Sequence, residues 1–135
     1  MELLQVAQHV DDMDRAVAFY RDLLDGELLA RFDPPGLAFF RLGTARLLLE
    51  EGAPSALLYL AVPDARARIA ELRAAGVEVV GDAALIHTDD VGTFGVPGAQ
   101  EWMGFVRDSE GNLLGIASRH APHADPEPPP LPTGS

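Results

Sequence analysis

The chain has 135 residues, 47% of them hydrophobic, and a formal net charge of −11 at pH 7. This size fits one domain with a proper core, and no apolar run is long enough to cross a bilayer, so we expect a soluble globular protein that does not associate with membranes. The negative net charge argues against nucleic acid as a partner and favours a positively charged small ligand. The chain contains no cysteine and no lysine, which excludes disulfides, thiolate nucleophiles and Schiff bases on lysine.

The first half of the chain predicts one strand, one helix and three further strands. Residues 2–10 are rich in Leu and Val, and their start, MELLQV, has no features of a secretion signal, so we expect a cytoplasmic protein. Asp12 is a good helix N-cap, and Gly26 is placed to end that helix. Apolar side chains between them recur at helical spacing, at Met13, Val17, Tyr20 and Leu24. The three strands are expected over residues 27–32, 37–42 and 45–50.

The second half repeats this order. A strand is expected over residues 56–62, and Asp64 caps a helix that buries Ile69 and Leu72 and ends at Gly76. Further strands are expected over residues 77–80, 84–88, 102–106 and 113–117. The simplest description is an internal duplication of roughly 55 residues.

Two segments lie outside the duplicated plan. Residues 89–100 (DDVGTFGVPGAQ) are polar and glycine-rich, which predicts a loop that serves either as a surface connection or as a lid over a cleft. Residues 119–135 form a proline-rich tail that cannot enter a helix or a sheet, although PPPLP has the composition of a polyproline II ligand.

Two stretches, VDDMDRAVAFYRDLLDG and FVRDSEGNLLGIAS, together resemble the vicinal oxygen chelate superfamily, which includes glyoxalase I, bleomycin-resistance proteins and extradiol dioxygenases. The resemblance covers residues 1–118 and implies an α+β fold. Two βαβββ modules, at about residues 1–53 and 55–118, would pair edge to edge with their mixed sheets curled into a cup. It also implies a homodimer, because the cups of many relatives are completed across the subunit interface.

In metal-dependent relatives, four strands each place one metal ligand at the centre of the cup. By the resemblance these positions fall on Gln5, Leu48, Leu57 and Gly115, and Glu50 lies one rung along from Leu48. An amide oxygen and one displaced carboxylate lack the coordination that a divalent ion needs, so we expect no metal cofactor. The alternative to a metal-free protein is one that binds a divalent metal ion. One form of this alternative is a relocated metal site made of His9, His87 and Glu50.

The resemblance and the strand parity together predict which residues line the cup. They are Gln5, Ala7, His9, Arg46, Leu48, Glu50, Leu57, Met103, Phe105 and Gly115. Trp102 is expected to face the helices instead. Such a mainly apolar cup with a few polar groups suits a small organic ligand.

Three functions fit these observations. The first is a metal-free protein that sequesters a small organic ligand, as bleomycin-resistance proteins do. The second is a glyoxalase-like lyase or isomerase, or another enzyme, that uses Gln5, His9 or Glu50 for acid/base chemistry; the catalytic candidates are His9 and Glu50. The third is an accessory module with a vestigial pocket. Ser109 lies on a turn but has no sign of a triad around it.

Overall fold

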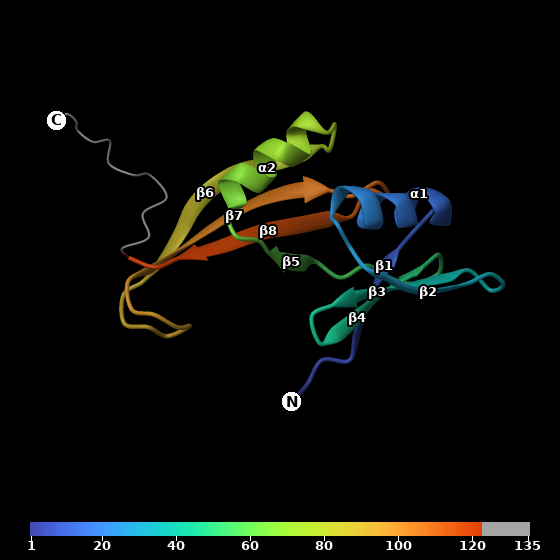
Figure 1. The fold of residues 1–135 in the computed structure, drawn as a ribbon, viewed down its shortest axis with the longest axis horizontal. Coiled ribbons are helices and arrows are strands. Elements are labelled where there is room, and N and C mark those ends of the chain that lie inside the picture. Colours follow the sequence, from blue (N-terminus) through green and yellow to red (C-terminus); the bar gives the residue numbers. More distant parts are fainter. Residues whose placement is uncertain (123–135) are drawn as a thin grey trace.

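Each half of the chain builds a four-stranded mixed sheet with a helix packed on one face (Figure 1). The computed structural model describes residues 1–122. The first half contains β1 (Gln5–His9), α1 (Met13–Ala18), the π-helical turn η1 (Phe19–Leu23), β2 (Leu28–Phe32), β3 (Leu37–Leu42) and β4 (Ala45–Glu50). The second half contains β5 (Leu58–Ala61), α2 (Ala65–Ala74), β6 (Val79–Asp89), β7 (Ala99–Arg107) and β8 (Leu113–His120).

The two sheets have equivalent topologies. Their strand orders are β1-β4-β3-β2 and β5-β8-β7-β6, with the first pair parallel and the others antiparallel in each. The predicted α+β class and the predicted pair of βαβββ modules are therefore confirmed. β3 and β4 have the predicted bounds. The two strands expected over residues 77–88 are instead one strand, β6, because register shifts on both sides of Gly81 absorb the break as bulges.

Aspartate side chains begin both helices. Asp12 accepts a hydrogen bond from the backbone N–H of Arg15 at 3.1 Å, and Asp64 accepts one from the N–H of Arg66 at 3.0 Å. Gly76, with a φ of 91°, ends α2 as predicted. At the end of η1 the left-handed residue is Asp25, and Gly26 is required for space, because a Cβ there would come within 2.7 Å of the Tyr20 carbonyl oxygen.

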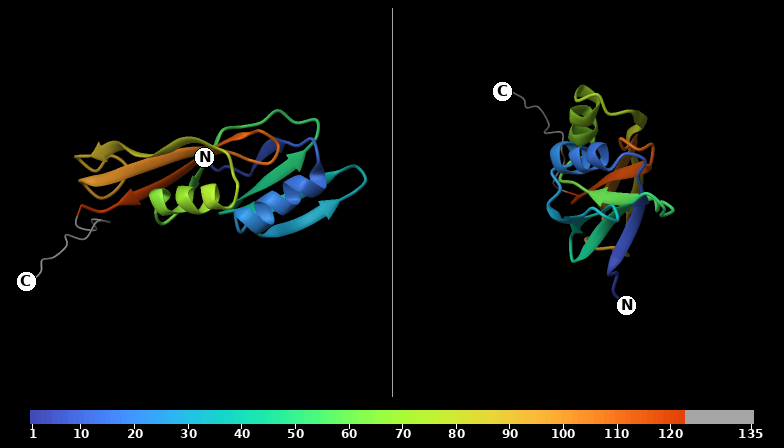
Figure 2. Two further views of the ribbon diagram at one scale, coloured as in Figure 1. Left: turned by 90° about the horizontal axis from the view of Figure 1, so that it is seen from above. Right: turned by 90° about the vertical axis from the view of Figure 1, so that its right-hand side faces the viewer.

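The hydrophobic core lies between the sheets and the helices. Both helices cover the same side of the two sheets, as two perpendicular views agree (Figure 2). On β4, Leu47 and Leu49 are 2% and 0% exposed, so Arg46, Leu48 and Glu50 point to the opposite side. We call this opposite side the helix-free face. The core is one cluster that runs through both halves.

The turn between β7 and β8 fastens the second half to the first. Glu110, whose side chain is fully buried, accepts hydrogen bonds from the backbone N–H groups of Asp11 and Asp12 at 2.7 and 2.9 Å, and forms an ion pair with Arg15. Next to it, the Tyr20 hydroxyl donates to Asp108 at 2.6 Å. The sequence DSEGN therefore joins the halves as well as turning the chain.

The two sheets approach each other at their edge strands β1 and β5. The backbone N–H of Ala56, just before β5, donates to the carbonyl oxygen of Ala7 at 3.3 Å and to the Gln8 side chain at 2.9 Å. None of the helices in residues 1–122 is long and apolar enough to cross a bilayer. β8 continues to His120, two residues past the predicted end of the folded domain, and residues 123–135 of the predicted tail lie outside the described part.

Candidate functional site

Six of the predicted site residues lie side by side on the first sheet. β1 and β4 are parallel neighbours, and their register pairs the two predicted groups rung by rung. The pairs are Gln5 with Arg46, Ala7 with Leu48, and His9 with Glu50. The flanking leucines of β4 are buried against the helices, so all six residues belong to the helix-free face.

The other four lie on the second sheet or at its edge. Phe105 and Gly115 are direct register partners on β7 and β8, and Met103 precedes Phe105 by two residues on the same face. Leu57 comes just before β5 and is 46% exposed. Trp102 has the opposite parity and, as predicted, faces a helix. The guanidinium of Arg66, on α2, lies 4.1 Å from the centre of its ring.

Tyr59 is a residue of this face that the sequence reasoning missed. It pairs with Gly115 across β5 and β8, and its ring meets that of Phe105 edge-on with centroids 6.0 Å apart. The alternation along LLYLAV carries the signal, because Tyr59 has the same strand parity as Leu57.

Gly115 lies underneath this aromatic pair. A Cβ at that position would come within 2.6 Å of Tyr59 Cδ1 and 3.3 Å of Phe105 Cε1. By the resemblance, this is the last-strand position at which metal-dependent relatives carry a carboxylate. Here the space that such a side chain would need is filled by aromatic rings.

Arg46, on β4, binds the side chain of Gln5, the residue at the expected first-strand metal position. Its Nε donates to the side-chain oxygen of Gln5 at 2.7 Å, and its guanidinium lies 5.6 Å from the ring centre of Phe39. Phe39, on β3, is the second residue that sequence reasoning missed. Because the guanidinium is positively charged and already uses the Gln5 oxygen, it opposes the binding of a cation at this position.

A hollow of about 330 Å³ opens on the helix-free face beside Arg46. Its walls are formed by β2, β3 and β4, at Leu29, Ala30, Phe32, Phe39 and Arg46. Phe32 and Phe39 meet edge-on with ring centroids 6.0 Å apart. The hollow is therefore aromatic with one cationic wall.

The residues of this face do not fit a divalent metal ion. The four expected positions hold an amide, two leucines and a glycine, none of which supplies a carboxylate or an imidazole. Within residues 1–122, no three His, Asp or Glu side chains are grouped so that they could hold an ion. The relocated site is not assembled either, since His87 lies on the outer strand β6 beside Phe94, whereas His9 and Glu50 lie on the first sheet.

The side chain of His9 is occupied by a neighbour. Its Nε2 lies 2.8 Å from Asp11 Oδ1, and this hydrogen bond raises the pKa of His9 above its usual value. Glu50 lies on the adjacent rung of β4. The two catalytic candidates are thus brought close in the sheet, but the imidazole is held by Asp11, and Glu50 makes no side-chain hydrogen bond to it among the described residues.

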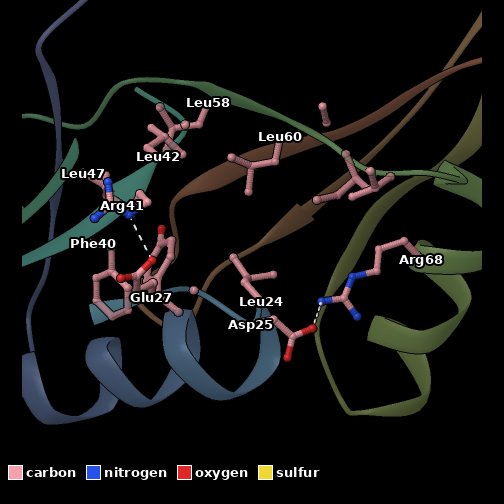
Figure 3. Close-up of a pocket in the computed structure, with 16 residues that line it drawn as sticks. Leu24, Asp25, Glu27, Phe40, Arg41, Leu42, Leu47, Leu58, Leu60 and Arg68 are labelled. Atoms are coloured by element: carbon pink, nitrogen blue, oxygen red, sulfur yellow. Dashed lines mark hydrogen bonds and ion pairs between the residues drawn. The ribbon is translucent and has the colours of Figure 1, made fainter. Parts of the chain in front are cut away.

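A second hollow, of about 560 Å³, lies on the helix side at the junction of the two halves (Figure 3). Its walls are apolar and come from both halves, including Leu24, Phe40, Leu42, Leu47, Leu58 and Leu60. Two ion pairs, Arg41–Glu27 at 2.9 Å and Arg68–Asp25 at 3.5 Å, lie at its rim. None of the predicted site residues lines it, because it lies on the opposite side of the sheets.

Comparison with known proteins places these features in a family. A sequence profile described as the glyoxalase/bleomycin resistance protein/dioxygenase superfamily matches residues 2–116. No curated protein matches the chain.

Solved structures share the fold at low sequence identity. Lactoylglutathione lyase from Agrobacterium tumefaciens is 23% identical, with a TM-score of 0.61 over 87% of this chain and 92% of the other. TnmS3, an antibiotic binding protein from Streptomyces sp. CB03234, is 21% identical, with a TM-score of 0.63 over 87% and 95%. Virulence protein STM3117 from Salmonella typhimurium is 18% identical, with a TM-score of 0.65 over 87% and 96%.

Proposed function

The chain belongs to the glyoxalase/bleomycin resistance protein/dioxygenase superfamily, and we propose that it binds a small organic ligand on the helix-free face without a metal ion. The observation that carries this proposal is the packing at Gly115. Tyr59 and Phe105 fill the place of a metal-binding carboxylate with apolar ring surface. Ring surface of this kind binds apolar and aromatic molecules by burial and stacking.

The composition of the helix-free face supports the same class of ligand. Phe39 and Leu48 supply apolar surface on the first sheet, where the Gln5 amide lies on the neighbouring strand β1. Met103 and Phe105 supply apolar surface on the second sheet. Ligand sites are typically apolar with a few polar groups that fix the orientation of the guest. Both an enzyme and an antibiotic binding protein share this fold, so the side chains of the face decide between the functions.

A second copy of the chain is the expected partner. Leu57 and Tyr59 are 46% and 54% exposed in the single chain, although both lie at the junction of the two sheets. Exposed apolar groups at one place mark an interaction site. We propose that the chain forms a homodimer in the cytoplasm and that the partner chain closes the cup over these residues.

The proposal is tested by titrating the 15N-labelled full chain, after treatment with EDTA, with naphthalene-2-carboxamide as a neutral aromatic probe. We expect saturable shifts of the backbone amides of Tyr59, Phe105 and Gly115. The variant Tyr59→Ala should weaken binding, because it removes half of the aromatic pair. The control Leu60→Trp narrows the helix-side hollow and should leave the affinity unchanged.

Three results would contradict the proposed site or its chemistry. Shifts confined to residues around the helix-side hollow, lost in Leu60→Trp and kept in Tyr59→Ala, would move the ligand to the other side of the sheets. One equivalent of Ni, Zn, Mn or Fe in the protein as purified, with binding abolished by EDTA, would show that a metal is required. If the natural chain turns over a substrate, and Glu50→Gln or His9→Ala abolishes that activity, the result would favour the enzyme hypothesis.

A further inference from the structure

All but two of the ten arginines are paired with a carboxylate within residues 1–122. The paired ones are Arg15, Arg21, Arg31, Arg41, Arg68, Arg73, Arg107 and Arg119. Arg46 and Arg66 have no acidic partner in this part of the chain, and each lies over an aromatic ring instead. These two guanidinium groups therefore differ from the other eight, although the chain has 21 acidic residues.

The two unpaired arginines differ in what surrounds them. Arg66 extends from α2 over Trp102, on the helix side of the second sheet. Arg46 lies on the helix-free face, is exposed, and forms one wall of the aromatic hollow. Its Nε is held by the neutral amide of Gln5, and its two Nη atoms make no hydrogen bond to the described residues. The outer edge of the guanidinium is therefore open to a ligand.

The side chains that line the hollow beside Arg46 suit an aromatic ring that carries an acidic group. Its volume of about 330 Å³ lies at the small end of the range for ligand sites. The Phe39 ring contacts the Phe32 ring edge-on, and the Arg46 guanidinium lies over it at 5.6 Å from its centre. A guanidinium with a free edge binds a carboxylate through parallel hydrogen bonds, and the aromatic walls accept a flat apolar body.

We propose that the ligand is a small aromatic acid whose carboxylate binds the Nη atoms of Arg46 and whose ring packs against Phe39. This inference rests on the proposed function and names its ligand class. Charge at the site then overrides the net charge of the chain. Glu50 lies four residues along β4, about 13 Å away at the usual rise of a strand, where physiological salt largely screens its repulsion.

Three probes with the same naphthalene body separate charge from shape. They are 2-naphthoate, naphthalene-2-carboxamide and 2-naphthylmethylammonium, each titrated into the 15N-labelled full chain. We expect 2-naphthoate to bind roughly tenfold more tightly than the amide and the ammonium to bind most weakly, since a charge-assisted hydrogen bond is worth about that ratio. The Nε–Hε cross-peak of Arg46 should shift on addition of 2-naphthoate.

Matched variants locate the preference. Arg46→Gln should make the affinities for the acid and the amide equal, and Arg46→Lys should restore part of the difference because it keeps the charge but loses the planar edge. Arg66→Gln removes the other unpaired guanidinium and should change neither the affinity for 2-naphthoate nor the affinity for naphthalene-2-carboxamide. Three results would overturn the inference: equal affinities of the natural chain for 2-naphthoate and naphthalene-2-carboxamide, a preference for the ammonium probe, or an effect of Arg66→Gln equal to that of Arg46→Gln. Shifts of the backbone N–H signals of Tyr59 and Phe105 would, in that case, leave the proposed function standing. Absence of binding by all three probes would overturn both.

Discussion

Gly115 lies so close beneath Tyr59 that a Cβ on the glycine would come within 2.6 Å of the tyrosine ring. The two residues are register partners on the parallel strands β8 and β5. Glycine at this position therefore does more than omit a metal ligand. It makes room for an aromatic side chain, and the position that by the resemblance carries a carboxylate in metal-dependent relatives is here part of an apolar surface.

Gly115→Glu should not create a metal site. The other three positions offer a metal only the Gln5 amide oxygen, which already accepts a hydrogen bond from Arg46. The new side chain must also displace Tyr59, so we expect a loss of about 1–3 kcal/mol in the free energy of unfolding. Urea denaturation and metal analysis after dialysis against Mn²⁺ or Zn²⁺ measure both effects.

The double variant Gly115→Glu/Tyr59→Ala serves as the control, because it removes the clash. It should be destabilised by less than the sum of the single variants. An additive result, or one equivalent of metal bound by Gly115→Glu, would contradict this interpretation.

Glu110 should make the stability of the protein depend on pH in acid. Burial alone would raise its pKa, but hydrogen bonds from Arg15 and from the backbone N–H groups of Asp12 and Asp11 outweigh burial and lower the pKa to about 2. The carboxylate thus contributes stability above its ordinary pKa of 4.5, and this contribution is lost as the pH falls toward 2.

Glu110→Gln should lower the free energy of unfolding at pH 7 by about 2 kcal/mol and flatten its pH dependence between pH 4.5 and 2. Denaturant titrations at a series of pH values measure both. Glu2→Gln, on the exposed N-terminal segment, should leave the curve unchanged. A pH dependence that persists in Glu110→Gln would assign it to other carboxylates.

The hydroxyl of Tyr20 is the second link between the halves. It donates to Asp108 at 2.6 Å, and burial together with the neighbouring carboxylate raises the pKa of Tyr20 well above its usual range. Tyr20→Phe should lower the free energy of unfolding by about 1–2 kcal/mol, because Asp108 loses a buried hydrogen-bond donor. The hydroxyl of Tyr59 makes no hydrogen bond to the described residues, so Tyr59→Phe should stay within about 0.5 kcal/mol of the natural chain in the same urea titration. Equal losses would contradict the link.

Asp89 should hold the long loop between β6 and β7. It is 1% exposed and accepts hydrogen bonds from the backbone N–H groups of Thr93 and Phe94 at 2.7 and 2.8 Å, which lower its pKa. Asp89→Ala should therefore speed amide hydrogen exchange at Thr93 and Phe94 while β8 stays protected. Unchanged exchange would mean that the loop is held by other contacts. This anchoring favours the surface connection over the lid among the two predicted roles of residues 89–100.

The local patterns of the sequence predicted the halves of the fold well. Capping aspartates, strand alternation and glycine breaks are local signals, and they gave both helix starts and the bounds of β3 and β4. The position of Leu48 among the expected metal ligands came from the family resemblance, and the strand alternation agrees with its place on the helix-free face. β6 was divided in two because bulges cannot be distinguished from turns without the neighbouring strand.

Contacts between distant segments were beyond the reach of the sequence. The sequence around Ser109 indicates only a turn, but Glu110 in that turn binds residues 95 to 99 positions away along the chain. Tyr59 and Phe39 were missed for a related reason, since the site was read at the positions of the metal ligands and not at their neighbours across the sheet.

The most direct test of a metal-free aromatic site is a titration of the EDTA-treated 15N-labelled chain with 2-naphthoate, followed by its amide spectrum. We predict saturable shifts at Phe39 and at the Arg46 side chain, both of which line the hollow, and we expect these shifts to be unchanged by added Zn²⁺ or Mn²⁺. Binding that appears only when a stoichiometric metal ion is restored would contradict the account.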